Sequence, residues 1–569
     1  MAPKRTATPP PLHDLPTAKE KKYDRQLRLW GASGQQALEE THILLIDNGS
    51  GVTGTEALKN LVLPGIGQFS ILDPAVVTEA DLGVNFFLED ESLGKFRAEE
   101  TVRLLVELNP DVKGTAVKEP LETFLAKDGV FTPYTLVLVA APIEPTNLAQ
   151  IQKHTAALNI PLFYLHSVGY YAHFSIQLPP AFPIVDTHPD ATALDDLRVL
   201  KPWPELIKFS QEKTNGIQSM SAHEKGHIPY VCLLLHYVDK WMAENDGKLP
   251  EAYKDKTAVR NMIRAEGGDE ENFEEAYGAV LKSLNPPKPS SSVREILTAP
   301  ETQQLSPNAA SFWFIARAVQ EFYNKHGVLP LPGGLPDMKA HSNDYISLQK
   351  IYKEKARQDF AEVTSTVQQL EQTAGHSKPI IDPKEIENFC KGAAHIHLVR
   401  GRPLQIAQPG ADVKFNDRAK ALANELTNPE GLMGLYIAFL AFDDFVATHS
   451  PPTTQADGTS SLIAPGEPGA DHEADAAKLT GIAHKIVDNL ITEAGTRIED
   501  PEYSELKEEI ERLCTEITRA GGKELHNIAS LAGGMIAQEI IKVLTAQYIP
   551  VHNCCLFDGI ASRSSVLRI

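Results

Sequence analysis

The chain has 569 residues, 42% of them apolar and 23% charged, and a formal net charge of −21 at pH 7. This length predicts more than one domain, and the apolar fraction is ordinary for a soluble globular protein. The acidic balance argues against nucleic acid as a partner, because phosphate binding needs a basic surface, and no apolar run is expected to reach the roughly 20 residues that span a bilayer.

Residues 1–19 contain basic residues and prolines without an apolar core behind them, which predicts a disordered tail rather than a secretory signal. A short amphipathic helix (Tyr23 to Gly31) and an apolar strand (His42 to Asp47) follow. A glycine turn, G-S-G-V-T-G (Gly49 to Gly54), leads into a helix and a second strand that ends at Asp73. The order of strand, glycine turn, helix, strand and acidic residue predicts a Rossmann-type phosphate cradle.

Strand and helix patterns continue to alternate after this unit. A helix is expected from about Gly94 to Asn109, and T-L-V-L-V-A-A (Thr135 to Ala141) is a continuous apolar run, typical of a central parallel strand buried on both faces. Two further strands complete the segment. Residues 20–178 are therefore expected to form a doubly wound α/β domain.

The pattern becomes mainly helical in the middle of the chain. Residues 179–519 are expected to form a large helical insertion, within which residues 451–476 are poor in bulky apolar side chains and predict a flexible segment. Residues 520–569 again show the alternating helix and strand pattern of an α/β domain. The simplest organisation is one α/β domain built from both ends of the chain, interrupted by the insertion.

The glycine turn alone is a weak signal for a ligand. Gly49, Gly51 and Gly54, with Asp73, could cradle a pyrophosphate at a helix N-terminus, or the glycines could serve only the tight turn and the packing of helix on strand. A nicotinamide-dependent oxidoreductase is one alternative that uses such a turn, but the sequence offers no second-domain catalytic constellation for it.

Several longer motifs are shared with one known family. They lie near both ends of the chain and in its middle: Tyr23 to Gly31, Leu58 to Gly67, Asn85 to Leu88, Ala532 to Lys542, His188 to Leu206, Ser311 to Trp313 and Leu335 to Ala356. Taken together they resemble the ubiquitin-activating enzyme superfamily, and within it the regulatory, non-catalytic subunits of Nedd/Rub-activating enzymes. The resemblance implies a pseudo-adenylation domain with a helical insertion that corresponds to half of a catalytic-cysteine domain.

Four departures from active members of that family imply that this chain does not activate ATP by itself. Val52 stands where a glycine is expected, Ala75 replaces an acid, Val84 replaces an arginine, and Pro142 stands where an aspartate would bind magnesium. Phosphoryl and adenylyl transfer depend on cationic groups and metal ions that stabilise developing charge. The resemblance therefore implies no cofactor of the chain's own, with ATP and Mg²⁺ bound by a catalytic partner.

The five cysteines are few and irregularly spaced, which predicts reduced thiols rather than disulfides or a zinc site. The family's thioester-forming cysteine follows a proline, and none of these residues has that setting: Cys232, Cys390, Cys514, Cys554 and Cys555. We expect no catalytic cysteine, because such a thiol needs an accessible, electropositive site.

One residue with a direct chemical role is implied by the resemblance. An arginine at the position of Arg25 reaches across a pseudo-twofold interface to the partner's ATP phosphates in the superfamily. The alternative is a surface arginine paired with Asp24 or another nearby acid, and Arg28 competes for such a pair.

His223 and His227, in H-E-K-G-H, superficially match the H-E-x-x-H spacing of zinc proteases. Gly226 and the following Ile-Pro weaken a helix there, and the sequence shows no third ligand. No metal site is predicted.

The resemblance implies a regulatory subunit of the heterodimeric activating enzyme for a Nedd/Rub modifier, inactive alone, in the cytoplasm, the nucleus or both. Its expected partners are the catalytic subunit, the modifier and the conjugating enzyme, with no nucleic acid and no membrane. Two alternatives stay open: a pure adaptor without any catalytic contribution, and a relative of the small SUMO-activating subunit, against which the long helical block argues.

Overall fold

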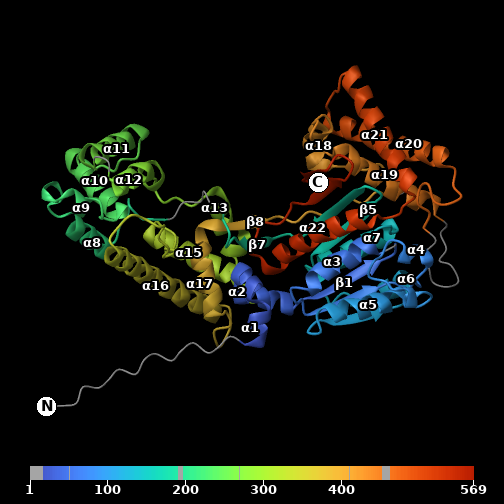
Figure 1. The fold of residues 1–569 in the computed structure, drawn as a ribbon, viewed down its shortest axis with the longest axis horizontal. Coiled ribbons are helices and arrows are strands. Elements are labelled where there is room, and N and C mark those ends of the chain that lie inside the picture. Colours follow the sequence, from blue (N-terminus) through green and yellow to red (C-terminus); the bar gives the residue numbers. More distant parts are fainter. Residues whose placement is uncertain (1–16, 50, 190–195, 268–269, 409, 451–461) are drawn as a thin grey trace, which may run out of the picture. The chain divides into compact units, whose positions relative to one another are not determined.

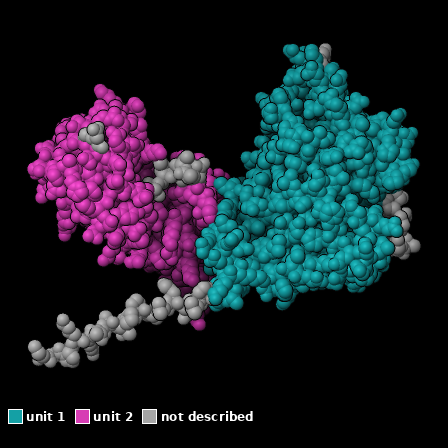
Figure 2. All heavy atoms as spheres, viewed as in Figure 1, with its two compact units in different colours: residues 1–182, 399–569 teal, residues 183–398 magenta. Residues whose placement is uncertain are grey.

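The computed structural model describes residues 17–49, 51–189, 196–267, 270–408, 410–450 and 462–569. The expected tail therefore lies almost wholly outside the described residues, as do Ser50 of the glycine turn and residues 451–461 of the segment expected to be flexible. The chain divides into two compact units, Met1–Phe182 with Val399–Ile569 and Pro183–Leu398 (Figure 2).

The first unit is built on an eight-stranded sheet whose order is β10-β9-β6-β5-β4-β1-β2-β3. The five strands from β3 to β5 run parallel, in the order typical of a Rossmann half, and β6, β9 and β10 extend them as antiparallel neighbours. The strands are β1 (His42–Asp47), β2 (Gln68–Leu72), β3 (Lys113–Val117), β4 (Leu136–Ala140), β5 (Leu162–Val168), β6 (Tyr171–Gln177), β9 (Cys554–Asp558) and β10 (Arg563–Leu567). The predicted α/β class is confirmed.

Helices cover both faces of this sheet (Figure 1). On one face α3 packs against α5 and α22, and on the other α7 packs against α6 and α19. The alternation along β1 explains this division: Leu44 and Ile46 join the cluster that includes Phe124 of α6, while Leu45 lies under α3. The helices of this unit are α1 (Ala18–Lys22), α2 (Asp24–Glu39), α3 (Val52–Val62), α4 (Glu79–Leu82), α5 (Arg97–Leu108), α6 (Leu121–Leu125), α7 (Pro145–Ala157), α18 (Ala419–Leu426), α19 (Met433–His449), α20 (His472–Ala494), α21 (Asp500–Ala520) and α22 (His526–Thr545).

Two short segments are more ordered than the sequence suggests. The expected tail gives way to helix α1 at Ala18, because Thr17 and Glu20 form a reciprocal capping box. Residues 472–476, expected to belong to the flexible segment, form the first turn of α20, where the Asp471 side chain accepts the Ala474 N–H.

The second unit is mainly helical, as the resemblance implies for the insertion. Its helices are α8 (Pro204–Thr214), α9 (Ala222–Lys225), α10 (Tyr230–Glu244), α11 (Tyr253–Gly267), α12 (Glu271–Ser283), α13 (Ser291–Thr298), α14 (Pro300–Gln303), α15 (Ser311–His326), α16 (Ser342–Thr373) and α17 (Pro383–Gly392). Strands β7 (Phe182–Val185) and β8 (Ile396–Val399) pair as a separate two-stranded sheet, where the chain leaves the first unit and returns to it.

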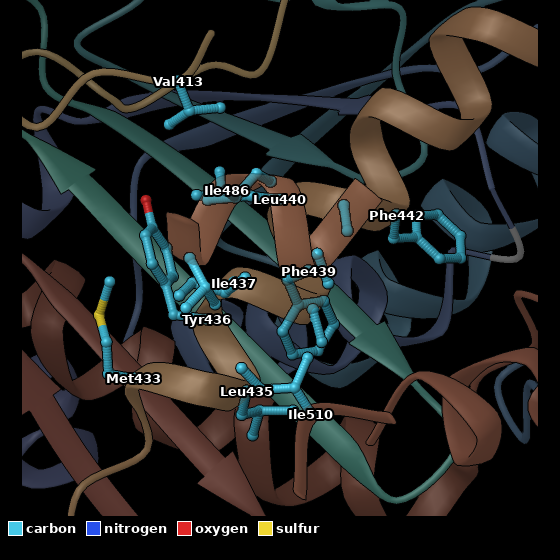
Figure 3. Close-up of a cluster of buried hydrophobic side chains, with 14 of the residues drawn as sticks. Val413, Met433, Leu435, Tyr436, Ile437, Phe439, Leu440, Phe442, Ile486 and Ile510 are labelled. Carbon is cyan, nitrogen blue, oxygen red and sulfur yellow. The ribbon is translucent and has the colours of Figure 1, made fainter. Parts of the chain in front are cut away.

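Residues 399–519, which the sequence places in the insertion, belong to the same compact unit as the sheet. The reason is an apolar core centred on α19, a helix that is buried almost all round. Figure 3 shows side chains of α19 in this cluster, with Ile486 of α20 and Ile510 of α21 beside them. The same cluster includes Val168 of β5 and Leu556 of β9, so helices 18–21 are packed against the sheet rather than away from it.

One described helix, α22, is long and apolar enough to cross a membrane by length and composition alone. This corrects the expectation that no apolar segment of the chain is long enough to span a bilayer. In the structure 61% of the apolar stretch of this helix is buried, and the helix packs on α3 in the core of the first unit.

Candidate functional site

The predicted phosphate cradle lies at the carboxyl end of β1. This strand ends at Asp47, and α3 begins at Val52 with Gly51 as its N-cap. The neighbouring strands β2 and β4 lie on either side of β1, and the strand order reverses between β1 and β4. Ligands of open α/β sheets bind at such a switch point.

The glycines of the turn are required by packing as well as by conformation. Gly51 has φ +75°, and a Cβ there would lie 2.1 Å from the Asp47 carboxylate. A Cβ on Gly54 would lie 2.9 Å from the Leu45 side chain. These contacts support the alternative in which the glycines serve the turn and the approach of α3 to the sheet.

The N-terminus of α3 is already capped by an anion that belongs to the chain itself. The Glu524 carboxylate accepts the Val52 N–H at 2.9 Å, the Thr53 N–H at 3.1 Å and the Thr53 hydroxyl at 2.5 Å. The free N–H groups of a helix N-terminus and the positive end of its dipole form the phosphate site of nucleotide-binding folds. Glu524 therefore occupies the place that a nucleotide phosphate would take.

Asp73, the acid predicted to remain from a nucleotide site, is held by an internal ion pair. The buried Arg97 donates from Nε to Asp73 at 2.6 Å and from Nη1 to Asp81 at 3.0 Å. The second Asp73 oxygen accepts the Ala75 N–H at 2.9 Å. Both carboxylate oxygens of Asp73 thus accept hydrogen bonds from within the protein.

Asp47 lies beside this network and is fully enclosed. Burial raises its pKa to about 7; the Arg97 charge opposes this shift, while the charges of Asp73 and Glu524 add to it. Four acids and one arginine therefore share the site. Their net negative charge disfavours a polyphosphate, in contrast to the cationic groups that such a ligand requires.

The predicted substitutions at Val52, Val84 and Pro142 have visible structural roles. Val52 is fully buried as the first residue of α3. The Val84 carbonyl oxygen lies 3.1 Å from Nδ1 of His526 at the start of α22. A Cβ on Gly49 would lie 2.9 Å from Cδ of Pro142, so the proline fills space directly against the turn.

Arg25 lies on α2 and is exposed. Its competitor Arg28 pairs with Asp24 at 3.0 Å. Among the described residues no ion pair or hydrogen bond includes the Arg25 side chain, so the local pairing with Asp24 is taken by Arg28. The trans role of Arg25 stays a prediction.

All five cysteines are buried and free. Burial raises the pKa of the thiols of Cys232, Cys390, Cys514 and Cys554 to about 12 and that of Cys555 to about 11. A thioester-forming cysteine needs a thiolate that can be reached from solvent. The arrangement of these thiols is unsuited to that chemistry.

Sequence reasoning did not find Glu524, Arg97 or Asp47 as parts of the site. Asp47 could have been identified, since it ends the first strand next to the glycine turn. Arg97 begins the helix after the second strand and carried a weaker signal. Glu524 is separated from Val52 by 472 residues, and nothing local in the sequence connects the two.

Comparison with known proteins identifies relatives of nearly the whole chain. Residues 23–569 match the ThiF family. The NEDD8-activating enzyme E1 regulatory subunit of Xenopus laevis is 37% identical over 97% of this chain and 99% of its own length. The proteins of the same name from Danio rerio and Drosophila melanogaster are 34% and 33% identical, over 98% and 99% of this chain and 100% of their own lengths. The chain therefore belongs to the ThiF family and, within it, to the regulatory subunits of NEDD8-activating enzymes.

Proposed function

We propose that the chain binds and completes a catalytic subunit that holds ATP and Mg²⁺, adenylates a Nedd/Rub-type modifier and carries the thioester cysteine. The observation that carries this proposal is the position of Glu524. An anion site that is closed by the chain's own carboxylate leaves the fold of an adenylation domain without its phosphate pocket.

The other charged and thiol groups support the same proposal, in which a partner subunit performs the catalytic steps. Arg97 is committed to Asp73 and Asp81, so the cation nearest the cradle is neutralised internally. The thiols are buried, with raised pKa values. Both features support the proposal that the partner performs the nucleotide and thioester steps, while this chain supplies scaffold and surface.

The surface contribution is proposed to include Arg25. It lies one helical turn before Leu29, whose side chain is 53% exposed, so a cation and an apolar residue share one face of α2. An unpaired arginine beside an exposed apolar residue suits a protein interface at which the guanidinium reaches a partner's phosphates. We place the assembled enzyme, with the conjugating enzyme as its acceptor, in the cytoplasm, the nucleus or both.

The test is modifier-dependent ATP–pyrophosphate exchange. This chain alone is expected to be silent, and its mixture with the candidate catalytic subunit is expected to exchange. Omitting the modifier from the mixture is the control. Exchange by this chain alone would contradict the proposal, because it would require a working nucleotide site where Glu524 and Arg97 now lie.

A further inference from the structure

A cluster of three histidines lies in the second unit, well away in sequence from the cradle. His223 is part of the four-residue helix α9, His227 follows that helix, and His341 is the N-cap residue of α16. One ring nitrogen of each can be chosen so that the three atoms lie within 4.8 Å of one another. His223 and His341 are exposed and His227 is partly buried, so a solvated ion can reach them.

One hydrogen bond in this cluster fixes the tautomer of the His227 ring. Nδ1 of His227 lies 2.7 Å from the backbone carbonyl oxygen of His223, and since a carbonyl can only accept, this nitrogen carries the proton. The other nitrogen, Nε2, then presents its lone pair. A backbone carbonyl is one of the common outer partners that orient a metal-binding histidine.

The backbone holds the two segments in register. The His341 N–H donates to the His227 carbonyl oxygen at 3.1 Å, and the two rings stack at 4.5 Å with an angle of 19° between their planes. The His223 ring centroid lies 4.5 Å from that of His227. The third histidine missing from the sequence motif is therefore supplied by His341, which is 114 positions beyond His227.

Glu224 does not act as the general base that a zinc protease would require. Its carboxylate accepts the Ser221 N–H at 2.8 Å and the Ser221 hydroxyl at 2.7 Å, which caps α9. Helix α9 itself ends at Lys225, so the cluster is not the long H-E-x-x-H helix of those enzymes. A binding site, rather than a hydrolytic one, is what the geometry offers.

We propose that His223, His227 and His341 bind one divalent transition-metal ion, for which Zn²⁺ is the natural candidate. Neutral imidazole nitrogens suit zinc, copper and nickel and are poor ligands for magnesium or calcium. Three protein ligands leave one coordination position for water or for a group from another molecule. The ion would join the α9 segment to the start of α16 within the second unit (α9 and α16 are labelled in Figure 1).

The test uses the full-length chain without a polyhistidine tag, titrated with Zn²⁺ by calorimetry after treatment with a chelator. Saturable binding of one ion per chain is expected. Replacing any one ligand (His223→Gln, His227→Gln or His341→Gln) should weaken binding about tenfold or more, since loss of an outer partner alone commonly costs 10–100-fold. His472→Gln, at an exposed histidine of α20 in the first unit, is the matched control and should bind as the wild type does.

The substitution at His341 separates binding from folding, because this residue makes no side-chain cap to α16. Circular dichroism should show that His341→Gln retains the wild-type helix content. Copper(II) electron paramagnetic resonance adds a direct readout: nitrogen hyperfine coupling should be present in the wild type and reduced in the variant. Zn²⁺ binding that is not saturable, or that is unchanged in all three ligand variants, would overturn the proposal.

Discussion

The carboxylate of Glu524 and the backbone N–H of Val52 are hydrogen-bonded at 2.9 Å across 472 residues of sequence. The bond joins the last part of the sheet-containing unit to the first turn of its first crossover helix. In nucleotide-binding relatives of this fold that turn receives a phosphate. In this chain the anion at that N-terminus is a covalently attached carboxylate rather than an exchangeable ligand.

Removing that carboxylate should uncap α3. Glu524→Ala leaves the N–H groups of Val52 and Thr53 without their acceptor, and the expected loss is about 1–2 kcal/mol of unfolding free energy, as for other N-cap deletions. Urea denaturation measures the loss. Added sulfate should stabilise the variant more than the wild type, because the vacated N-terminus can then bind an anion. Glu508→Ala, at an exposed acid of α21, is the control and should change stability little.

Arg25→Ala should lower modifier-dependent ATP–pyrophosphate exchange by the assembled enzyme by about 10²–10³-fold, the range for loss of one donor to developing charge. Assembly, followed by size-exclusion chromatography, should persist. Arg28→Ala is the matched control, since Arg28 lies on the same helix but is paired with Asp24. Equal effects of the two substitutions would favour a structural role for the helix or a pure adaptor.

Arg97 is expected to stabilise the first unit strongly. Arg97→Met leaves Asp73 and Asp81 buried without their cation, and breaking a buried pair in this way commonly costs about 3–5 kcal/mol. Denaturant unfolding checks this value. Adding Asp73→Asn to Arg97→Met should recover part of the loss, because one buried charge is then neutralised. A double variant no more stable than the single one would show that the charge of Asp73 is not the cause.

A buried cluster on the opposite face of the sheet should make stability depend on pH. Burial lowers the pKa of His173 to about 3 and that of His166 well below its ordinary value, while burial raises the pKa of Asp443 to about 7. As pH falls below about 6.5, unfolding takes up a proton at each histidine, so the unfolding free energy decreases there. Asp443 acts in the opposite direction: its contribution is complete below about pH 4 and is lost as pH rises through about 7.

Between about pH 4 and 6.5 the two histidines outweigh the one acid, and this cluster should lower stability by up to about 1.4 kcal/mol per pH unit of acidification. Asp443→Asn should double that slope, and His173→Phe should bring it close to zero. Chemical denaturation at several pH values gives both slopes. A wild-type slope unaffected by either substitution would mean that these groups titrate alike in the folded and unfolded states.

The local features of the fold could be predicted because each is determined by a short stretch of sequence. The apolar run His42–Asp47 is β1 at the predicted bounds, and Gly31, with φ +66°, interrupts α2 where the first helix was expected to end. The glycine turn and the acid after β2 were placed correctly as well. Each of these depends on neighbouring residues or on the short repeat of a strand (two residues) or a helix (about 3.6 residues).

The long-range features could not be predicted in the same way. His341 completes the histidine cluster from a distant helix, and Glu524 reaches α3 from the loop between α21 and α22. Only the folded backbone brings these residues together. The unit boundary near Val399 is a further case. The mainly helical pattern expected for residues 179–519 could not show that the apolar surface of α19 is buried against β5 and β9 rather than within the second unit.

The distance in sequence between Val52 and Glu524 also sets an order of events during synthesis. Translation at about 5–20 residues per second takes roughly 25–95 s to cover the 472 residues between them. Once β5 has been made, the emerging chain has α3 and the parallel strands, but for the rest of that interval it lacks the cap for α3, the helix α22 that covers it, and strand β9 beside β6. The apolar faces that these elements later cover lack those partners until residues 520–569 have been made, so the nascent first unit should depend on chaperones until then.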